Sequence, residues 1–155
     1  MQLFYNPALN DGDNLFSFDK IESKHIVKVL RKKEGDKLHI TNGRGHLFTA
    51  EILIANSTQC KASIIATEKR HPKMYRLHLA VAPTKSADRF EWFLEKVTEI
   101  GVHEITPILC DRSERKTLKM ERLQKVIMSA MKQSLRTYLP KLNEPVSFAE
   151  FIAQD

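Results

Sequence analysis

Cysteine is scarce in this sequence, in which Cys60 and Cys110 are the only two among 155 residues. Small domains held together by disulfides are dense in cysteine, so that class is excluded. Both cysteines stand in mostly apolar runs, and we expect two small core residues without a disulfide. Unpaired cysteines are usual where thiols stay reduced, which predicts a cytoplasmic location.

Long apolar runs are also missing. No stretch of the sequence approaches the roughly 18 apolar residues of a membrane-spanning helix. The first residues, MQLFYNP, lack the charged segment and the apolar core of a secretion signal. We therefore expect no membrane partner, and an acidic membrane surface is only the weaker alternative for the basic residues described below.

Patterns typical of metal sites and of nucleophilic hydrolysis are absent. The six histidines show no ligand spacing and are not interleaved with the cysteines, so we expect no metal. No Ser-His-Asp or Cys-His arrangement stands out. Glycine is scarce as well, and the stretch Asn42-Gly43-Arg44-Gly45 lies between two predicted strands. It predicts a hairpin turn rather than a phosphate-binding loop, which would precede a helix.

Positive charge is what the sequence has in excess. The 25 Lys and Arg residues outnumber the 19 Asp and Glu residues, which gives a formal net charge of +6. A basic chain favours polyanionic partners, and nucleic acid is the first of these.

The first half of the chain alternates short strands with turns. Alternating or apolar runs predict strands over 3–5, 15–18, 37–41, 46–54 and 60–67. Apolar residues at helical spacing between Ile21 and Leu30 predict one short helix, followed by the basic residues Arg31, Lys32 and Lys33. Five short strands and one helix predict a small closed or nearly closed barrel over 1–68, with a charged linker over 68–73.

The second half reads strand, helix, strand, helix, which predicts a parallel sheet over 74–155. The first strand covers 76–82, and the first helix begins after Ser86 and ends at Ile100, before Gly101 as a left-handed cap. The second strand covers 105–110, where Pro107 favours an edge or a bulge. The second helix starts near 117 and ends at or before Pro140. The tail after 145 shows no third strand, so we expect an incomplete α/β domain.

One face of the second helix is basic. Opposite its apolar stripe, a quarter of the circumference carries Arg122, Lys125, Lys132, Gln133 and Arg136, and the preceding loop adds Arg112, Arg115 and Lys116. A guanidinium fork suits phosphate or a base edge. A solvated surface helix is equally compatible with this spacing. Glu91, Glu95 and Glu99 recur every four residues on the first helix, and we expect them to face cations on a neighbouring helix.

Three motifs resemble those of a known family. Residues 95–102, EKVTEIGV, resemble the EKxTELGV signature of the RsmE family, the uracil-N3 methyltransferases of 16S ribosomal RNA, which are of the SPOUT (knotted) class. PILCDRS (107–113) and QSLR (133–136) are similar to the family's P…SERS and EQSxR segments, although Lys132 replaces a common Glu. The resemblance implies a PUA-like RNA-binding barrel over 1–68, a SPOUT domain over 74–155 and a homodimer. It also implies methyl transfer from S-adenosylmethionine (SAM) to a uridine of the small ribosomal subunit.

The same resemblance implies site residues. Arg112 and Arg136 are candidate catalytic residues that would stabilise charge on the deprotonated uridine or hold the adjacent phosphate. Lys85 follows the first strand of the sheet, where ligands usually bind. The glycine-rich cofactor loop of the family is expected beyond Asp155. The candidate RNA-binding residues are Arg31, Lys32, Lys33, Lys85, Arg115, Arg122, Lys125, Lys132 and Gln133. The alternative function is an RNA-binding module without catalysis.

Overall fold

The structure, a computed structural model, describes residues 1–114 and 117–153. The chain divides into two compact units, Met1–His71 and Pro72–Asp155. Each unit has its own hydrophobic core. The division falls inside the predicted linker, but the preceding strand continues through Lys69, so the linker starts later than predicted.

The first unit is a five-stranded curled sheet. Its order is β1-β3-β4-β5-β2, in which β1 runs parallel to β3 and the other pairs are antiparallel. Irregular pairing between β4 and β5 bends the sheet. Within the described residues, no pairing joins the edge strands β1 and β2, so the sheet curls without closing there. Of the two predicted forms, closed or nearly closed, it has the nearly closed one. All five predicted strands are present: β1 Leu3–Tyr5, β2 Leu15–Ser17, β3 Lys37–Thr41, β4 His46–Ile54 and β5 Lys61–Lys69.

The concave side of this sheet buries an apolar cluster that includes Phe4, Ile26, Phe48 and Cys60. Cys60 has no exposed surface, as predicted, and burial raises the pKa of its thiol. Both cysteines are free. The predicted turn is confirmed: Gly43 and Gly45 adopt positive φ between β3 and β4.

The predicted helix of the first unit consists of two pieces. α1 (Lys20–Lys24) begins at Asp19, whose side chain accepts a hydrogen bond from the Glu22 backbone N–H at 2.8 Å. The chain then widens into a π-helical turn, η1 (His25–Val29), which places Ile26 in the core. Arg31 follows with φ of 55°, a left-handed conformation that ends the helix.

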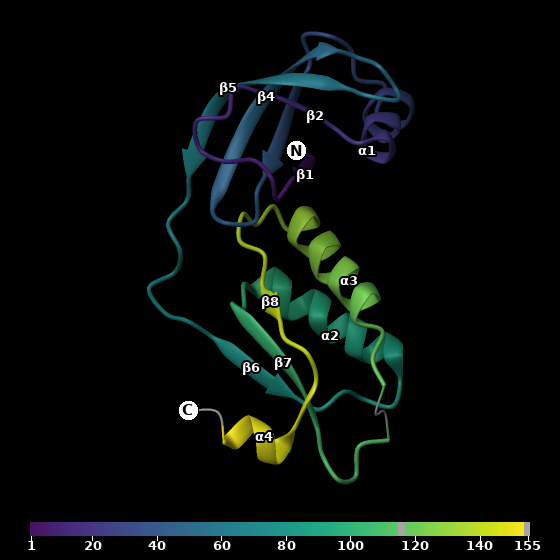
Figure 1. Cartoon of the computed structure of the whole chain (residues 1–155), viewed down its shortest axis with the longest axis vertical. Helices are drawn as coiled ribbons and strands as arrows, with labels where there is room; N and C mark the ends of the chain where they lie inside the picture. The colour runs from purple at the N-terminus through teal and green to yellow at the C-terminus, as the bar shows by residue number, and fades with distance from the viewer. Residues whose placement is uncertain (115–116, 154–155) are drawn as a thin grey trace. The chain divides into compact units, whose positions relative to one another are not determined.

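The second unit is a parallel sheet in the order β6-β7-β8, with β9 also paired to β7. Helices α2 and α3 lie side by side on one face of it (Figure 1). Phe90 and Leu94 of α2, Ile105 of β7 and Ile127 of α3 form the core between them. The elements are β6 His78–Val81, α2 Ala87–Ile100, β7 Glu104–Leu109, α3 Met120–Gln133, β8 Lys141–Leu142, β9 Val146–Ser147 and α4 Phe148–Ile152.

A third strand is present, so the prediction that none follows Pro145 is wrong. It is split into β8 and β9, two pieces of two residues that are too short to show alternation in the sequence. β7 lies at the centre, and Pro107 is therefore not on an edge strand. The carbonyls of His103 and Ile105 accept hydrogen bonds from the third strand. Alternate residues of a strand face the same neighbouring strand, so Pro107 also faces the third strand. Proline has no N–H to donate to it, and the third strand is split at this position.

The two long helices of this unit, α2 and α3, end in the same way. Gly101 (φ 95°) and Leu135 (φ 56°) are left-handed residues directly after the last turns of α2 and α3. In each case the next backbone N–H donates to a carbonyl five residues earlier, Val97 or Met131, at 3.0 Å. The end of α2 was predicted, whereas α3 ends at Gln133, before the predicted Pro140.

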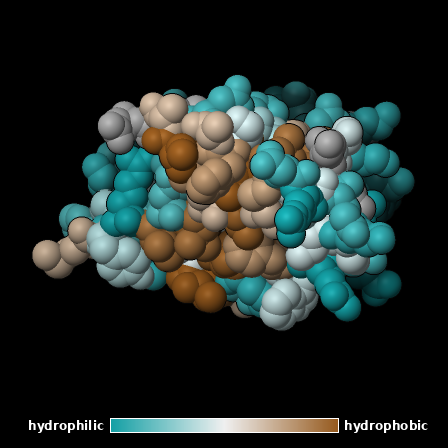
Figure 2. Space-filling view, turned by 90° about the horizontal axis from the view of Figure 1, so that it is seen from below, coloured by the Kyte–Doolittle hydropathy of each residue, from teal (hydrophilic) through white to brown (hydrophobic). Residues whose placement is uncertain are grey.

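α4 lies on the opposite face of the sheet from α2 and α3. Its Phe151 ring contacts His78, with the ring centroids 5.7 Å apart. Figure 2 shows apolar side chains gathered in the middle of the face that this unit turns to the viewer. The exposed apolar residues of the second unit include Phe148 and Ile152 of α4. Among the described residues, no helix combines the length and the apolar character needed to cross a membrane.

Candidate functional site

The carboxyl ends of β6 and β7 carry two loops that meet. Lys85 lies in the loop between β6 and α2, and Glu114 lies in the loop after β7. Their side chains form an ion pair with 3.3 Å between Nζ and Oε2, and both are mostly exposed. Lys85 therefore lies at the predicted edge of the sheet, where parallel strands usually present ligand-binding groups.

Arg112 lies on a tight turn at the same edge. The Ser113 backbone N–H donates to the Cys110 carbonyl, and the Cys110 N–H donates to Ser113 Oγ, both at 2.9 Å. These reciprocal bonds fix the backbone on either side of Arg112, which is exposed. Within the described part of the chain, no hydrogen bond or ion pair engages its guanidinium.

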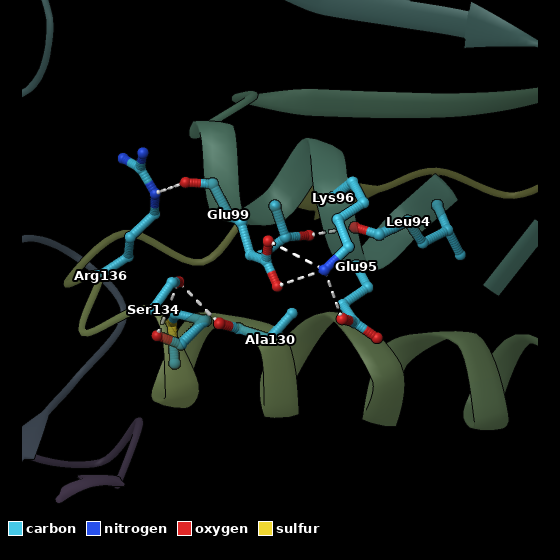
Figure 3. Close-up of polar contacts among 9 residues, drawn as sticks. Leu94, Glu95, Lys96, Glu99, Ala130, Ser134 and Arg136 are labelled. Atoms are coloured by element: carbon cyan, nitrogen blue, oxygen red, sulfur yellow. Dashed lines mark hydrogen bonds and ion pairs between the residues drawn. The ribbon is translucent and has the colours of Figure 1, made fainter. Parts of the chain in front are cut away.

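Arg122 is not a freely solvated residue of the helix surface. Its Nε lies 2.7 Å from Glu91 Oε1 and its Nη2 lies 3.0 Å from Glu91 Oε2, a two-point ion pair between α3 and α2. The expectation that Glu91 faces a cation of the neighbouring helix is confirmed. It is wrong for Glu95 and Glu99, because both bind Lys96 of their own helix, at 2.9 and 3.0 Å (Figure 3). The Lys96 hydrogen bond lowers the pKa of Glu95.

Two hollows adjoin the start of α3. The smaller has a volume of about 130 Å³ and is lined by Ala87, Phe90, Glu91, Leu118, Lys119, Arg122 and Leu123. The other is an open hollow of about 460 Å³ lined by Lys119, Met120, Glu121, Arg122 and Lys125. Lys125 is exposed there, as predicted, and Lys119 is a further cation at this end of the helix.

Arg136 lies beyond the end of α3 and not on its basic face, because Leu135 turns the chain. Its Nε donates to the Glu99 carbonyl at 2.6 Å (Figure 3). Its Nη2 donates to the Ile100 carbonyl, also at 2.6 Å. These carbonyls belong to the last turn of α2, which has no further N–H groups to satisfy them. A Cβ on Gly101 would lie 2.4 Å from Arg136 Nη1, so the guanidinium packs directly on this glycine.

The end of α3 presents three of the predicted residues in different ways. Ser134, next to them, donates from Oγ to the Ala130 carbonyl at 2.7 Å and so closes the last turn (Figure 3). Gln133 is exposed, Lys132 is half-buried, and Arg136 is turned toward α2. The predicted basic face of five residues is therefore divided between an ion pair, an exposed segment and a helix cap.

The structure does not bring Arg112 and Arg136 together. Lys85, at the edge that carries Arg112, directly precedes Ser86, which caps the start of α2, whereas Arg136 caps the end of that helix. The 14 residues of α2 span about 21 Å. Within one chain, the two arginines lie at opposite edges of the sheet, and one uridine cannot contact both.

In the first unit, Arg31, Lys32 and Lys33 lie together. They line an open hollow of about 480 Å³ with Val27, Glu34 and Ala55. The Lys33 N–H donates to Asp36 Oδ2 at 2.8 Å, which fixes the turn that follows. This arrangement places three cations and one carboxylate, Glu34, around one hollow. The remaining predicted residue, Arg115, lies outside the described residues.

No pattern in the sequence predicts the polar cluster around Glu104, at the amino ends of the strands. Glu104 is only 8% exposed. It accepts hydrogen bonds from Asn143 Nδ2 at 2.9 Å, Lys141 Nζ at 3.3 Å and Arg76 Nη2 at 2.5 Å. Its pKa falls to about 2, chiefly because of the Asn143 hydrogen bond. Arg76 precedes β6, whereas Lys141 and Asn143 lie in β8 and directly after it, all of them far from Glu104 along the chain, so their sequence spacing carries no signal.

No group of three or more His, Cys, Asp or Glu residues within 1–114 and 117–153 could hold a metal ion.

Two family models match the chain. A model described as an RNA methyltransferase domain matches residues 70–155, and one described as an RNA methyltransferase PUA domain matches residues 18–65. The ribosomal RNA small subunit methyltransferase E of Bacillus subtilis is 27% identical over 144 residues, which are 88% of this chain and 56% of that protein. The protein named ribosomal RNA small subunit methyltransferase E 2 in Borreliella burgdorferi is 33% identical over 77% of this chain and 51% of its own length.

Solved structures resemble the whole chain. A probable rRNA-methyltransferase from Porphyromonas gingivalis matches with a TM-score of 0.89 and 39% identity, over 100% of this chain and 64% of that one. A Legionella pneumophila protein assigned as a methyltransferase, with bound SAM, matches with a TM-score of 0.85 and 28% identity, over 99% and 66%. The chain thus spans about half to two thirds of the length of these relatives.

Proposed function

Since this chain belongs to the RsmE family of RNA methyltransferases, we propose that it takes part in methylating N3 of a uridine in 16S ribosomal RNA, with SAM as the methyl donor. The names of its relatives support ribosomal RNA of the small subunit as the substrate, and the SAM-bound relative supports the cofactor. The position N3 rests on the resemblance of the sequence motifs.

One observation carries the assignment of a catalytic group, namely the exposed guanidinium of Arg112, without a partner among the described residues, on a fixed turn at the carboxyl edge of β7. N3 of uracil is a weak acid, and its loss of a proton leaves negative charge shared with the two neighbouring carbonyl oxygens. A cation held in place beside these oxygens stabilises that charge without reorganisation, which is how preorganised donors lower a barrier. Arg112 is placed to do this, or to hold the adjacent phosphate.

Arg136 receives a different role. Its Nε and Nη2 already donate to the two carbonyls that end α2. Moving the guanidinium to a substrate would expose these carbonyls and release the side chain from Gly101. We therefore assign the charge-stabilising role to Arg112 alone and assign Arg136 to holding the helix end.

RNA binding falls to exposed cations of both units. Arg31, Lys32 and Lys33 line the hollow of the first unit, and Lys85 and Lys125 lie at the carboxyl edge of the second. Such residues neutralise phosphates and attract RNA over distance. The proposed set also includes Lys132 and Gln133 at the end of α3, together with Arg115. Arg122 joins the set when its ion pair with Glu91 is broken.

Neither of the two hollows at the start of α3 is assigned to SAM. Ligands of this size occupy pockets of about 300–1,000 Å³, whereas the hollow between α2 and α3 measures about 130 Å³. The larger hollow at the start of α3 is open and lined by cations and Glu121. We therefore assign no cofactor-binding residue. By the family resemblance, we also propose a SPOUT-type fold for the second unit and a homodimer.

The alternative from another class is an RNA-binding module without catalysis. The exposed cations described above suffice for it.

Nucleoside mass spectrometry separates the two functions. The product of the complete gene is incubated with small-subunit ribosomal RNA and SAM carrying a deuterated methyl group. The proposal predicts deuterated N3-methyluridine, and Arg112→Ala should abolish most of it. RNA that binds but gains no methyl group would refute the enzyme and leave the binding module. A methyl group on another atom would refute N3.

A further inference from the structure

The amino edge of the second sheet is a basic surface that no comparison assigns. Three parallel strands begin there, at His78, Glu104 and Lys141, so the residues that precede them gather at one edge. Four cations belong to this edge, and Glu104 is the carboxylate that two of them share. They are Lys73, Arg76, Arg136 and Lys141. Arg76 and Lys141 keep 73% and 67% of their side chains exposed.

An exposed aromatic ring stands among these cations. Tyr75 is 55% exposed, and His103 packs against it at right angles, with 6.0 Å between the ring centroids. Lys73 Nζ donates to the Tyr75 hydroxyl at 2.7 Å and to the Ile100 carbonyl at 3.1 Å. The lysine thus holds the ring from its hydroxyl end, at the rim.

The ring is not needed to complete the hydrophobic core. Tyr75 is outside the apolar cluster of the second unit, and its hydroxyl bonds to a surface lysine. An exposed aromatic side chain flanked by cations is the arrangement with which proteins bind single-stranded nucleic acid, because a base stacks on the ring while its phosphates meet the charges.

We propose that this edge binds single-stranded RNA, with one unpaired base on Tyr75 and the neighbouring phosphates on Lys73 and Arg76. The inference rests on the proposed function in that it takes the partner to be the RNA substrate. It adds a second contact surface on that RNA. Duplex RNA does not fit, since its bases are stacked on one another and its edges lie in grooves.

The distance between the two edges defines what this surface does. α2 separates it from Arg112 by about 21 Å. It therefore binds RNA that flanks the target uridine, and it contributes to affinity rather than to the chemical step. Variants should raise KM for RNA and leave kcat at saturating RNA unchanged.

The test measures binding of a short fluorescein-labelled single-stranded RNA to the 155-residue chain by anisotropy. Tyr75→Ala should weaken binding about tenfold or more, as loss of a stacked base does. Tyr75→Phe is the matched control, because it keeps the ring and loses only the hydroxyl, and it should bind within about twofold of the parent chain. Lys73→Gln should lower the slope of log K against log salt by about 0.7, the share of one phosphate on a single strand. Lys37→Gln, an exposed lysine of β3, should leave the slope unchanged.

Three results would overturn the inference: unchanged affinity in Tyr75→Ala, equal affinity for duplex RNA, or equal competition by polyglutamate, which would indicate an acidic protein partner. Methyl transfer by the complete gene product reports separately on the proposed function. If methylation proceeds while Tyr75→Ala changes neither affinity nor KM, only the second surface falls.

Discussion

The two edges of the β6-β7-β8 sheet use the same residue types for different purposes. At the amino edge, Arg136 caps α2 and Glu104 accepts hydrogen bonds from three side chains, so these groups hold the fold. At the carboxyl edge, Lys85 and Glu114 form an exposed pair, and Arg112 has no partner within the described residues. The role of an arginine in a motif shared with the family is therefore inferred from the groups to which its N–H donors already bond.

The largest effect should come from the carboxyl edge. Arg112→Ala in the complete gene product should lower single-turnover methyl transfer about 100-fold or more, because one preorganised donor to developing charge is lost. Its melting temperature should stay close to that of the parent protein, since exposed substitutions change stability by less than about 0.5 kcal/mol.

Rapid-quench kinetics at saturating RNA provide this rate. Arg112→Lys keeps the charge but not the planar fork, and it should recover part of the activity. Normal turnover in Arg112→Ala would remove the distinction between the edges.

At the amino edge, the effect should appear in stability. Arg136→Ala removes the charged donor of the Glu99 carbonyl and leaves the Ile100 carbonyl with Lys73 alone, which costs about 1.5–3 kcal/mol in the free energy of unfolding. Urea titration measures this cost. Gly101→Ala provides a check on the contact itself: its own cost should be smaller in the Arg136→Ala background, because the added Cβ no longer meets the guanidinium.

Glu104 should make the amino edge sensitive to acid. Its pKa in the folded chain is about 2, below its ordinary value of 4.5. A lowered pKa contributes stability that is fully present above about pH 4.5 and is lost as the pH falls toward about 2. Unfolding free energies of the parent chain and of Glu104→Gln should therefore converge between these values. A difference that stays constant with pH would show that the carboxylate is not stabilised as described.

The smallest effect belongs to Lys125 on the exposed side of α3. Lys125→Ala should weaken RNA binding modestly and reduce the salt slope by about 0.7, the contribution of one phosphate. Single-turnover methyl transfer at saturating RNA should not change. A large loss of rate would move the chemistry from the loop after β7 to the helix.

The sequence predicted those elements whose signals are local. The five strands of the first unit, the turn at Gly43 and the start and end of α2 were all predicted from turn residues and apolar spacing. Arg136 was placed on the second helix, although α3 ends at Gln133, because the left-handed residue after it is Leu135, where helices commonly have glycine. β8 and β9 were missed because two-residue strands show no alternation.

Contacts between distant segments explain the errors at the site. The partner of Arg122 is Glu91, 31 residues away, and that of Arg136 is the end of α2, 36 and 37 residues away. Helical spacing placed both arginines on one solvated face. Tertiary structure instead used one for helix packing and one for capping, and left Arg112 exposed.

The most direct test of the difference between the edges is the single-turnover rate of Arg136→Ala. The rate is measured with saturating RNA and saturating SAM, at a temperature well below the melting temperature of the variant. If Arg136 serves only to hold α2, the rate should lie within a few-fold of the parent enzyme although the variant unfolds more easily. A loss of about 100-fold in the folded variant, equal to that of Arg112→Ala, would show that both arginines act on the same reacting group and would contradict the separation of the two edges.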